Sequence, residues 1–115
     1  MLLASVVLFA LAAAGGVVMS LKVVRGELAP WPLSVGHGAL AAVGLVTLLV
    51  AVVDAGFEGG AVVWSLILFL VTALGGFGLL ALHIMGRSAP KGFVAGHGVL
   101  AVVAFVLLLV GVFGT

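Results

Sequence analysis

The sequence contains no cysteine and no tyrosine, and only 6% of its 115 residues are charged. The absence of cysteine excludes disulfides, iron–sulfur clusters and thiolate metal sites. Soluble domains carry about a quarter charged residues, so the low charge content excludes that class of protein. A formal net charge of +1 gives no electrostatic field for a polyanion, which argues against nucleic acid as a partner. Hydrophobic residues instead make up 66% of the chain, and 18 residues are glycine.

Four apolar runs are each long enough to cross the hydrocarbon core of a bilayer, which takes about 20 residues as a helix. They cover residues 2–21, 33–53, 61–82 and 93–113. The runs show no alternation of polar residues, and backbone groups in lipid must be satisfied within a helix or a closed barrel, so helices are favoured. The sequence predicts an all-α integral membrane four-helix up-down bundle, with residues 1–115 forming a single transmembrane domain.

The connectors between the runs separate the charges by sign. Connectors 22–32 and 85–92 hold all four basic residues, whereas connector 54–60 holds two of the three acidic residues. The positive-inside rule therefore predicts that the two basic connectors face the cytoplasm of a bacterial inner membrane, with both termini on the opposite side. The basic residues are Lys22, Arg25, Arg87 and Lys91.

The sequence repeats itself at a spacing of sixty residues. Between residues 28–50 and 88–110, 12 of 23 positions are identical, including Pro30 with Pro90. We therefore predict two tandem two-helix hairpins, about 1–55 and 61–115, related by a pseudo-two-fold axis along the membrane normal. The first and third runs match more weakly, through the pairs Ser5/Ser65, Leu8/Leu68, Phe9/Phe69, Gly15/Gly75 and Gly16/Gly76.

The triplet Gly-His-Gly occurs once in each repeat and contains two of the three histidines, His37 and His97. Each histidine follows the repeated proline by seven residues, about 10 Å along a helix, so both imidazoles are predicted inside the membrane at the same depth. An ionisable side chain at that depth normally points into the bundle. The small residues around them, which predict room inside the bundle, are Gly36, Gly38, Ala41, Gly44, Gly96, Gly98, Ala101 and Ala104.

The second and fourth helices of an up-down bundle lie diagonally. A diagonal of roughly 14 Å is too wide for two imidazoles to touch, but it suits two imidazoles with the iron of a flat macrocycle between them. The propionates of a haem need cations, and four lie at the same end of the bundle as the histidines: Lys22, Arg25, Arg87 and Lys91. We therefore predict one haem b, with His37 and His97 as its metal ligands.

The two Gly-His-Gly segments resemble those of membrane b-type cytochromes such as the cytochrome b561 group, in which histidines on transmembrane helices clamp haem and glycines let it pack closely. Those larger proteins commonly use four histidines for two haems, whereas this chain has one symmetric pair. The resemblance implies one bis-histidine haem at His37 and His97. It also implies a role in transmembrane or membrane-surface electron transfer, as an electron carrier rather than an enzyme with its own substrate.

The third histidine, His83, ends the third run, and its counterpart in the repeat is Val23. Two interpretations apply to it. It is an interfacial histidine favoured by the helix dipole, or it is a functional residue that serves as a hydrogen-bond partner for a propionate or a quinone or as a replacement axial ligand. The glycine pairs at 15–16 and 75–76 are predicted to be simple helix contacts.

Three functions stay open at this point. The chain is an electron carrier working with a quinone or a redox partner protein, a non-catalytic accessory subunit of a larger membrane complex, or a protein that binds or transports Zn²⁺ or Cu²⁺ through its histidines. Transport is least favoured, because the half of the bundle away from the histidines offers few polar side chains for a path. Small lipid-facing residues also make a homodimer plausible.

Overall fold

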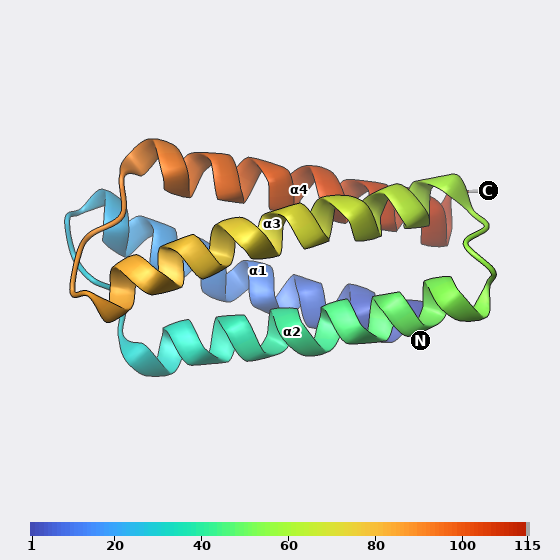
Figure 1. The fold of residues 1–115 in the computed structure, drawn as a ribbon, viewed down its shortest axis with the longest axis horizontal. Helices are drawn as coiled ribbons and strands as arrows, with labels where there is room; N and C mark the ends of the chain where they lie inside the picture. The colour runs from blue at the N-terminus through green and yellow to red at the C-terminus, as the bar shows by residue number, and fades with distance from the viewer. Residues whose placement is uncertain (115) are drawn as a thin grey trace.

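The computed structural model describes residues 1–114, which form four long helices and no strand (Figure 1). α1 spans Leu2–Val24, α2 spans Trp31–Asp54, α3 spans Gly60–Ile84 and α4 spans Lys91–Phe113. The four predicted membrane helices are confirmed. All four extend slightly beyond the apolar runs, because a helix continues into the interface after its hydrocarbon-spanning part has ended.

The helices form an up-down bundle of two hairpins. α1 packs closely on α2 and α3 on α4, and the hairpins meet through α1 with α4 and through α2 with α3. The pairs α1/α3 and α2/α4 therefore lie across the diagonals. In Figure 1 the connectors 25–30 and 85–90 lie together at one end, called here the basic end. Connector 55–59, the start of α1 and the end of α4 lie at the other end, the acidic end.

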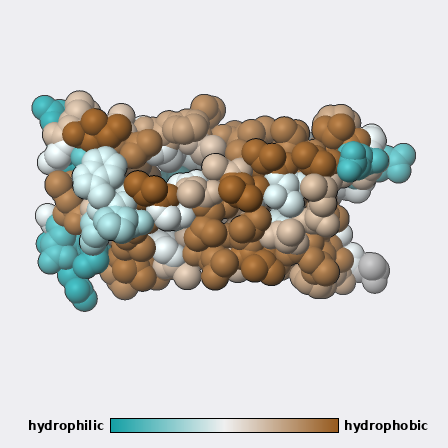
Figure 2. Space-filling view, turned by 90° about the horizontal axis from the view of Figure 1, so that it is seen from below, coloured by the Kyte–Doolittle hydropathy of each residue, from teal (hydrophilic) through white to brown (hydrophobic). Residues whose placement is uncertain are grey.

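Large apolar side chains cover the outside of the bundle. Leu74, Ile84 and Val46 are 69%, 67% and 60% exposed, respectively. Figure 2 shows the result on one face, where a wide hydrophobic band separates hydrophilic residues at the two ends. Because all four helices are also long and apolar enough to cross a membrane, the chain is an integral membrane protein whose outer surface contacts lipid.

Two equivalent turns end α1 and α3 at the basic end. Gly26 and Gly86 have φ angles of 79° and 70°, in the left-handed region that favours glycine. The N–H of Gly26 donates to the carbonyl of Val23 at 2.9 Å, and the residue after each glycine donates to the carbonyl five residues earlier. This is the Schellman arrangement. Pro30 and Pro90 then immediately precede α2 and α4, where their missing N–H costs nothing.

The bundle is tightly packed in its acidic half. Leu48 and Leu108, which are counterparts in the repeat, are both 0% exposed. At the edge of this core, Phe9 and Phe69 stack across the α1/α3 diagonal, with ring centroids 3.8 Å apart and planes 3° from parallel. Residues that are equivalent in the two repeats thus lie together in the core. The buried core consists of Phe9, Leu48, Val52, Val62, Leu66, Phe69, Ala104 and Leu108.

Candidate functional site

A cavity of about 630 Å³ lies between the helices on the basic side of the Phe9–Phe69 pair. All four helices line it, mostly with alanine, glycine, valine and leucine. Its volume falls within the roughly 300–1,000 Å³ that is typical of sites for small molecules and cofactors. The cavity is therefore the candidate site. Its polar or charged lining residues are Ser20, Ser34, His37, Thr72, His83, Arg87 and His97.

The structure brings His37 of α2 and His97 of α4 together across this cavity. Their ring centroids are 6.5 Å apart, and the ring planes are inclined by 72°. Both side chains are partly buried and neither points away into lipid, because both line the cavity. The diagonal placement of α2 and α4 is what allows two positions sixty residues apart to face each other.

His37 is held in one orientation by the main chain of α1. Its Nδ1 lies 2.7 Å from the carbonyl oxygen of Ala12. A carbonyl oxygen only accepts hydrogen bonds, so the Nδ1 carries the proton and donates this bond. In a neutral imidazole the Nε2 then keeps its lone pair, and a histidine in this form is a metal ligand.

His97 has a similar setting but a less complete one. The repeat counterpart of Ala12 is Thr72, whose backbone lies beside the His97 ring. The His97 Nδ1 is nevertheless buried without a hydrogen-bond partner among residues 1–114. The hydroxyl of Thr72 instead donates to the carbonyl of Leu68 at 2.7 Å. Since an unpaired buried nitrogen is costly, His97 is the less satisfied of the two imidazoles.

Each imidazole rests against a glycine pair on the neighbouring helix of its own hairpin. A Cβ added at Gly16 of α1 would lie 3.1 Å from Cε1 of His37, and one at Gly76 of α3 would lie 3.3 Å from Cε1 of His97. The sequence predicts simple helix contacts here, and the structure shows that the contacting group is the imidazole itself. The sequence does carry a signal for this contact, because each repeat has its glycine pair at the same distance before its histidine.

We expect Gly16→Val to destabilise the bundle by about 1–3 kcal/mol, the usual cost of overpacking a filled interior site. The added methyl groups have no space unless the His37 ring moves and its bond to Ala12 breaks. Reversible unfolding in mixed detergents measures the difference. Gly36→Val is the matched control, because a Cβ there meets nothing within 4 Å. Equal stability of the two variants would contradict the conclusion that Gly16 leaves space for the His37 ring.

The structure separates the other predicted site residues into two groups. Six of them line the cavity: Gly38, Ala41, His83, Arg87, Gly98 and Ala101. Gly36 and Gly96 are exposed, because each lies one position before its histidine and faces about 100° away around the helix. Gly44 is buried at the edge of the core, and a Cβ there would lie 3.4 Å from the Phe9 ring. Arg25 is exposed outside the cavity lining, and Lys91 lines a separate groove.

His83 lies at the basic end of the contact line between α2 and α3, called here the α2/α3 seam, and closes it. The ring of Trp31 stacks on it with centroids 4.1 Å apart, and its Nδ1 lies 3.2 Å from the hydroxyl of Ser34. Both partners belong to the start of α2. In the other seam, between α1 and α4, the counterparts of Trp31 and His83 are Lys91 and Val23, which do not form such a stack. This difference breaks the two-fold symmetry of the bundle.

No family model, curated protein or solved structure matches the chain. The resemblance to the cytochrome b561 group therefore rests on the two Gly-His-Gly segments. The chemistry of the site is argued below from the cavity and the residues that line it.

Proposed function

We propose that this chain is a membrane b-type haem protein that transfers electrons, and that His37 and His97 would hold the haem iron. One observation carries the proposal: two imidazoles from diagonal helices face each other, with centroids 6.5 Å apart, in a cavity of cofactor size. Cofactor sites in helix bundles are built in this way, from inward side chains on facing helices.

The spacing of the rings fits two imidazoles that share one metal ion. With a metal–nitrogen bond of about 2.0 Å on each side, the two ring centroids are expected roughly 6.3 Å apart. The observed 6.5 Å is close to this value. It also lies towards the long end of the range of about 4.5–7 Å for rings in direct contact. The separation is therefore compatible with a shared metal ion and also with a direct edge-to-face contact of the two rings.

The number of protein ligands favours haem over a bare metal ion. Among residues 1–114, no group of three or more His, Asp or Glu side chains is placed to hold a metal. A structural zinc site takes four protein ligands, and a catalytic one takes three. Haem brings four ring nitrogens of its own and requires only the axial ligands from the protein. The pair His37 and His97 is complete for haem and incomplete for zinc.

The surrounding residues have distinct roles in this proposal. The Ala12 carbonyl holds the His37 ring so that Nε2 is free to bind, and the Phe9–Phe69 stack closes the cavity towards the acidic half. Arg87 lies in the lining at the open, basic side, where it would meet a propionate carboxylate, whereas His83 is already engaged by Trp31 and Ser34. When bound, haem supplies a one-electron redox couple. With both His37 and His97 bound to the iron, no coordination position would stay open for a substrate, which favours electron transfer over substrate chemistry.

The proposed orientation follows from the charges. All four basic residues belong to the basic end, and on the positive-inside rule we propose that this end faces the cytoplasm, with both termini outside, in a bacterial inner membrane. The cavity then lies in the cytoplasmic half of the bilayer. Electrons would be exchanged there with a quinone or a redox partner protein.

The direct test is the absorption spectrum and haem content of the protein purified in mild detergent from a haem-producing host. We expect a Soret band, a reduced spectrum of the bis-imidazole type after dithionite, and one haem per chain. A colourless protein that carries stoichiometric zinc or copper would replace the haem proposal with a metal-binding function. A colourless, metal-free protein that co-purifies with a larger complex would replace it with the accessory role.

A further inference from the structure

The two seams between the hairpins are equivalent in the repeat but differ in their packing. Trp31, Ser34 and His83 fill the basic end of the α2/α3 seam through a ring stack and a polar contact. Their counterparts at the α1/α4 seam are Lys91, Val94 and Val23, which lack both aromatic rings. A groove of about 460 Å³ runs along this second seam.

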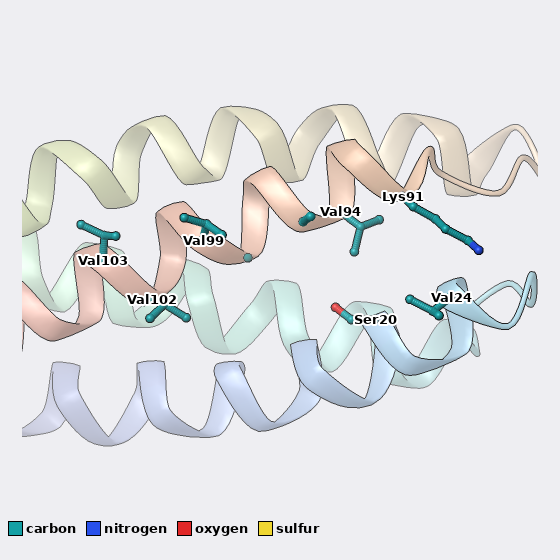
Figure 3. Close-up of a pocket in the computed structure, with 9 residues that line it drawn as sticks. Ser20, Val24, Lys91, Val94, Val99, Val102 and Val103 are labelled. Carbon is teal, nitrogen blue, oxygen red and sulfur yellow. The ribbon is translucent and has the colours of Figure 1, made fainter.

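The groove, called here the α1/α4 groove, is apolar along its length and basic at one end. Figure 3 shows Ser20 and Val24 of α1 opposite Val94 of α4, with Val99, Val102 and Val103 further along α4 and the Lys91 side chain extended towards the connectors. Lys91 is its one charged lining residue. β-Branched valines have few rotamers, so the walls are stiff. The lining residues are Ser20, Val24, Lys91, Val94, Ala95, Gly98, Val99, Val102 and Val103.

The length of the groove matches one leaflet of a bilayer. Lys91 and Val103, at its two ends, are twelve residues apart on α4, which is about 18 Å along the helix axis. Half of the hydrocarbon core measures roughly 15 Å. Lys91 is also the first residue of α4, at the level where the helix leaves the membrane for its connector. The charge therefore lies at headgroup depth and the valines at acyl-chain depth.

We propose that the α1/α4 groove binds an anionic phospholipid, with one acyl chain along the valines and the headgroup phosphate at Lys91. The groove faces lipid, so an acyl chain is the available apolar occupant. Among residues 1–114 the Lys91 ammonium forms no salt bridge, and a free cation at the headgroup level favours an anionic lipid over a zwitterionic one. Basic residues between transmembrane helices at this membrane face are a known basis for recognising lipid headgroups.

The bound lipid would also form part of the wall of the central cavity. Five residues line both the groove and the cavity, so the two spaces adjoin along the α1/α4 seam: Ser20, Val24, Val94, Gly98 and Val102. An acyl chain in the groove would cover the α1/α4 side of the cavity, as Trp31 and His83 cover the α2/α3 side. The lipid proposal rests on the groove alone and stands whether or not the cavity holds haem.

Native mass spectrometry of the purified protein tests the charge recognition. Delipidated protein is titrated with dioleoyl phosphatidylglycerol or dioleoyl phosphatidylcholine, and the occupancies are compared. We expect about fivefold tighter binding of the phosphatidylglycerol, the gain from one surface cation. Lys91→Gln should reduce this preference to near unity. The control Lys22→Gln makes the same charge change at the basic end outside the groove lining, and it should keep the preference.

A second variant tests the location. Ala95→Trp fills the groove and should weaken binding of both lipids about tenfold, because the acyl chain loses its apolar contacts. Its repeat counterpart, Val35→Trp, places the same ring outside the groove and should leave binding unchanged. If Ala95→Trp does not fold, the lipid preference of Lys91→Gln still tests the proposal. Equal binding of the two lipids by the natural sequence, or a folded Ala95→Trp that binds as before, overturns the proposal. So does a dimer that buries Lys91.

Discussion

His37→Ala and His97→Ala are each expected to abolish the bis-imidazole haem spectrum. One imidazole remains in each variant, so the iron loses one of its two protein bonds and the cofactor is held from one side. Loss of a group that only supports a ligand typically costs about 10–100-fold in affinity. Loss of the ligand itself should therefore weaken haem retention by at least about 100-fold. Haem content per chain and the reduced absorption spectrum measure the effect.

The third histidine is the matched control for this experiment. His83 lines the same cavity but is engaged by Trp31 and Ser34, away from the His37–His97 pair. His83→Ala should keep one haem per chain with both axial bonds. Added imidazole should restore the six-coordinate spectrum of His37→Ala, because the vacated space lies inside the cavity. Full haem retention by both single variants, or its loss in His83→Ala alone, would refute the assigned ligands.

Phe9→Ala is expected to destabilise the protein strongly. Phe9 is 6% exposed, stacks on Phe69 and lies against Gly44, at the boundary between the packed core and the cavity. Truncation of a buried phenylalanine costs about 3–5 kcal/mol in soluble proteins. In a bilayer the transfer from water contributes less and lost dispersion contacts contribute most, so we expect about 3 kcal/mol. This corresponds to a folding equilibrium more than about 100-fold less favourable.

Unfolding in mixed detergents, followed by circular dichroism, measures this loss. Phe113→Ala is the control, because it removes the same ring from a position that is 61% exposed at the end of α4. It should change the unfolding free energy by less than about 0.5 kcal/mol. If both variants lose the same unfolding free energy, the Phe9–Phe69 stack does not stabilise the boundary between the core and the cavity.

The sequence was sufficient to predict the bundle because membrane folding is governed by local properties. Each apolar run is long enough to span the bilayer, and a helix satisfies its backbone groups without reference to the rest of the chain. The sixty-residue repeat added the hairpin architecture, which the structure confirms. The equal depth of His37 and His97 followed from the repeat as well, since equivalent residues of parallel copies lie at one level.

The lining of the site was harder to read from the sequence. Gly36 and Gly38 flank the same histidine, yet only Gly38 lines the cavity. Gly15 and Gly16 resembled ordinary helix contacts, and the structure places them under the His37 ring. A side chain's neighbours depend on the rotation of each helix about its axis, and that rotation is set by packing between helices.

By itself, the sequence determined the number of membrane helices, their pairing into two hairpins and the matched depth of two histidines, because hydrophobic length and repetition are encoded along the chain. Only the tertiary structure decided that the bundle is packed towards the acidic end and hollow towards the basic end. It also decided that Trp31 and His83 close one seam while Lys91 leaves the equivalent seam open. These features depend on which side chains from different helices fill the same space, and the order of residues along one helix does not specify that.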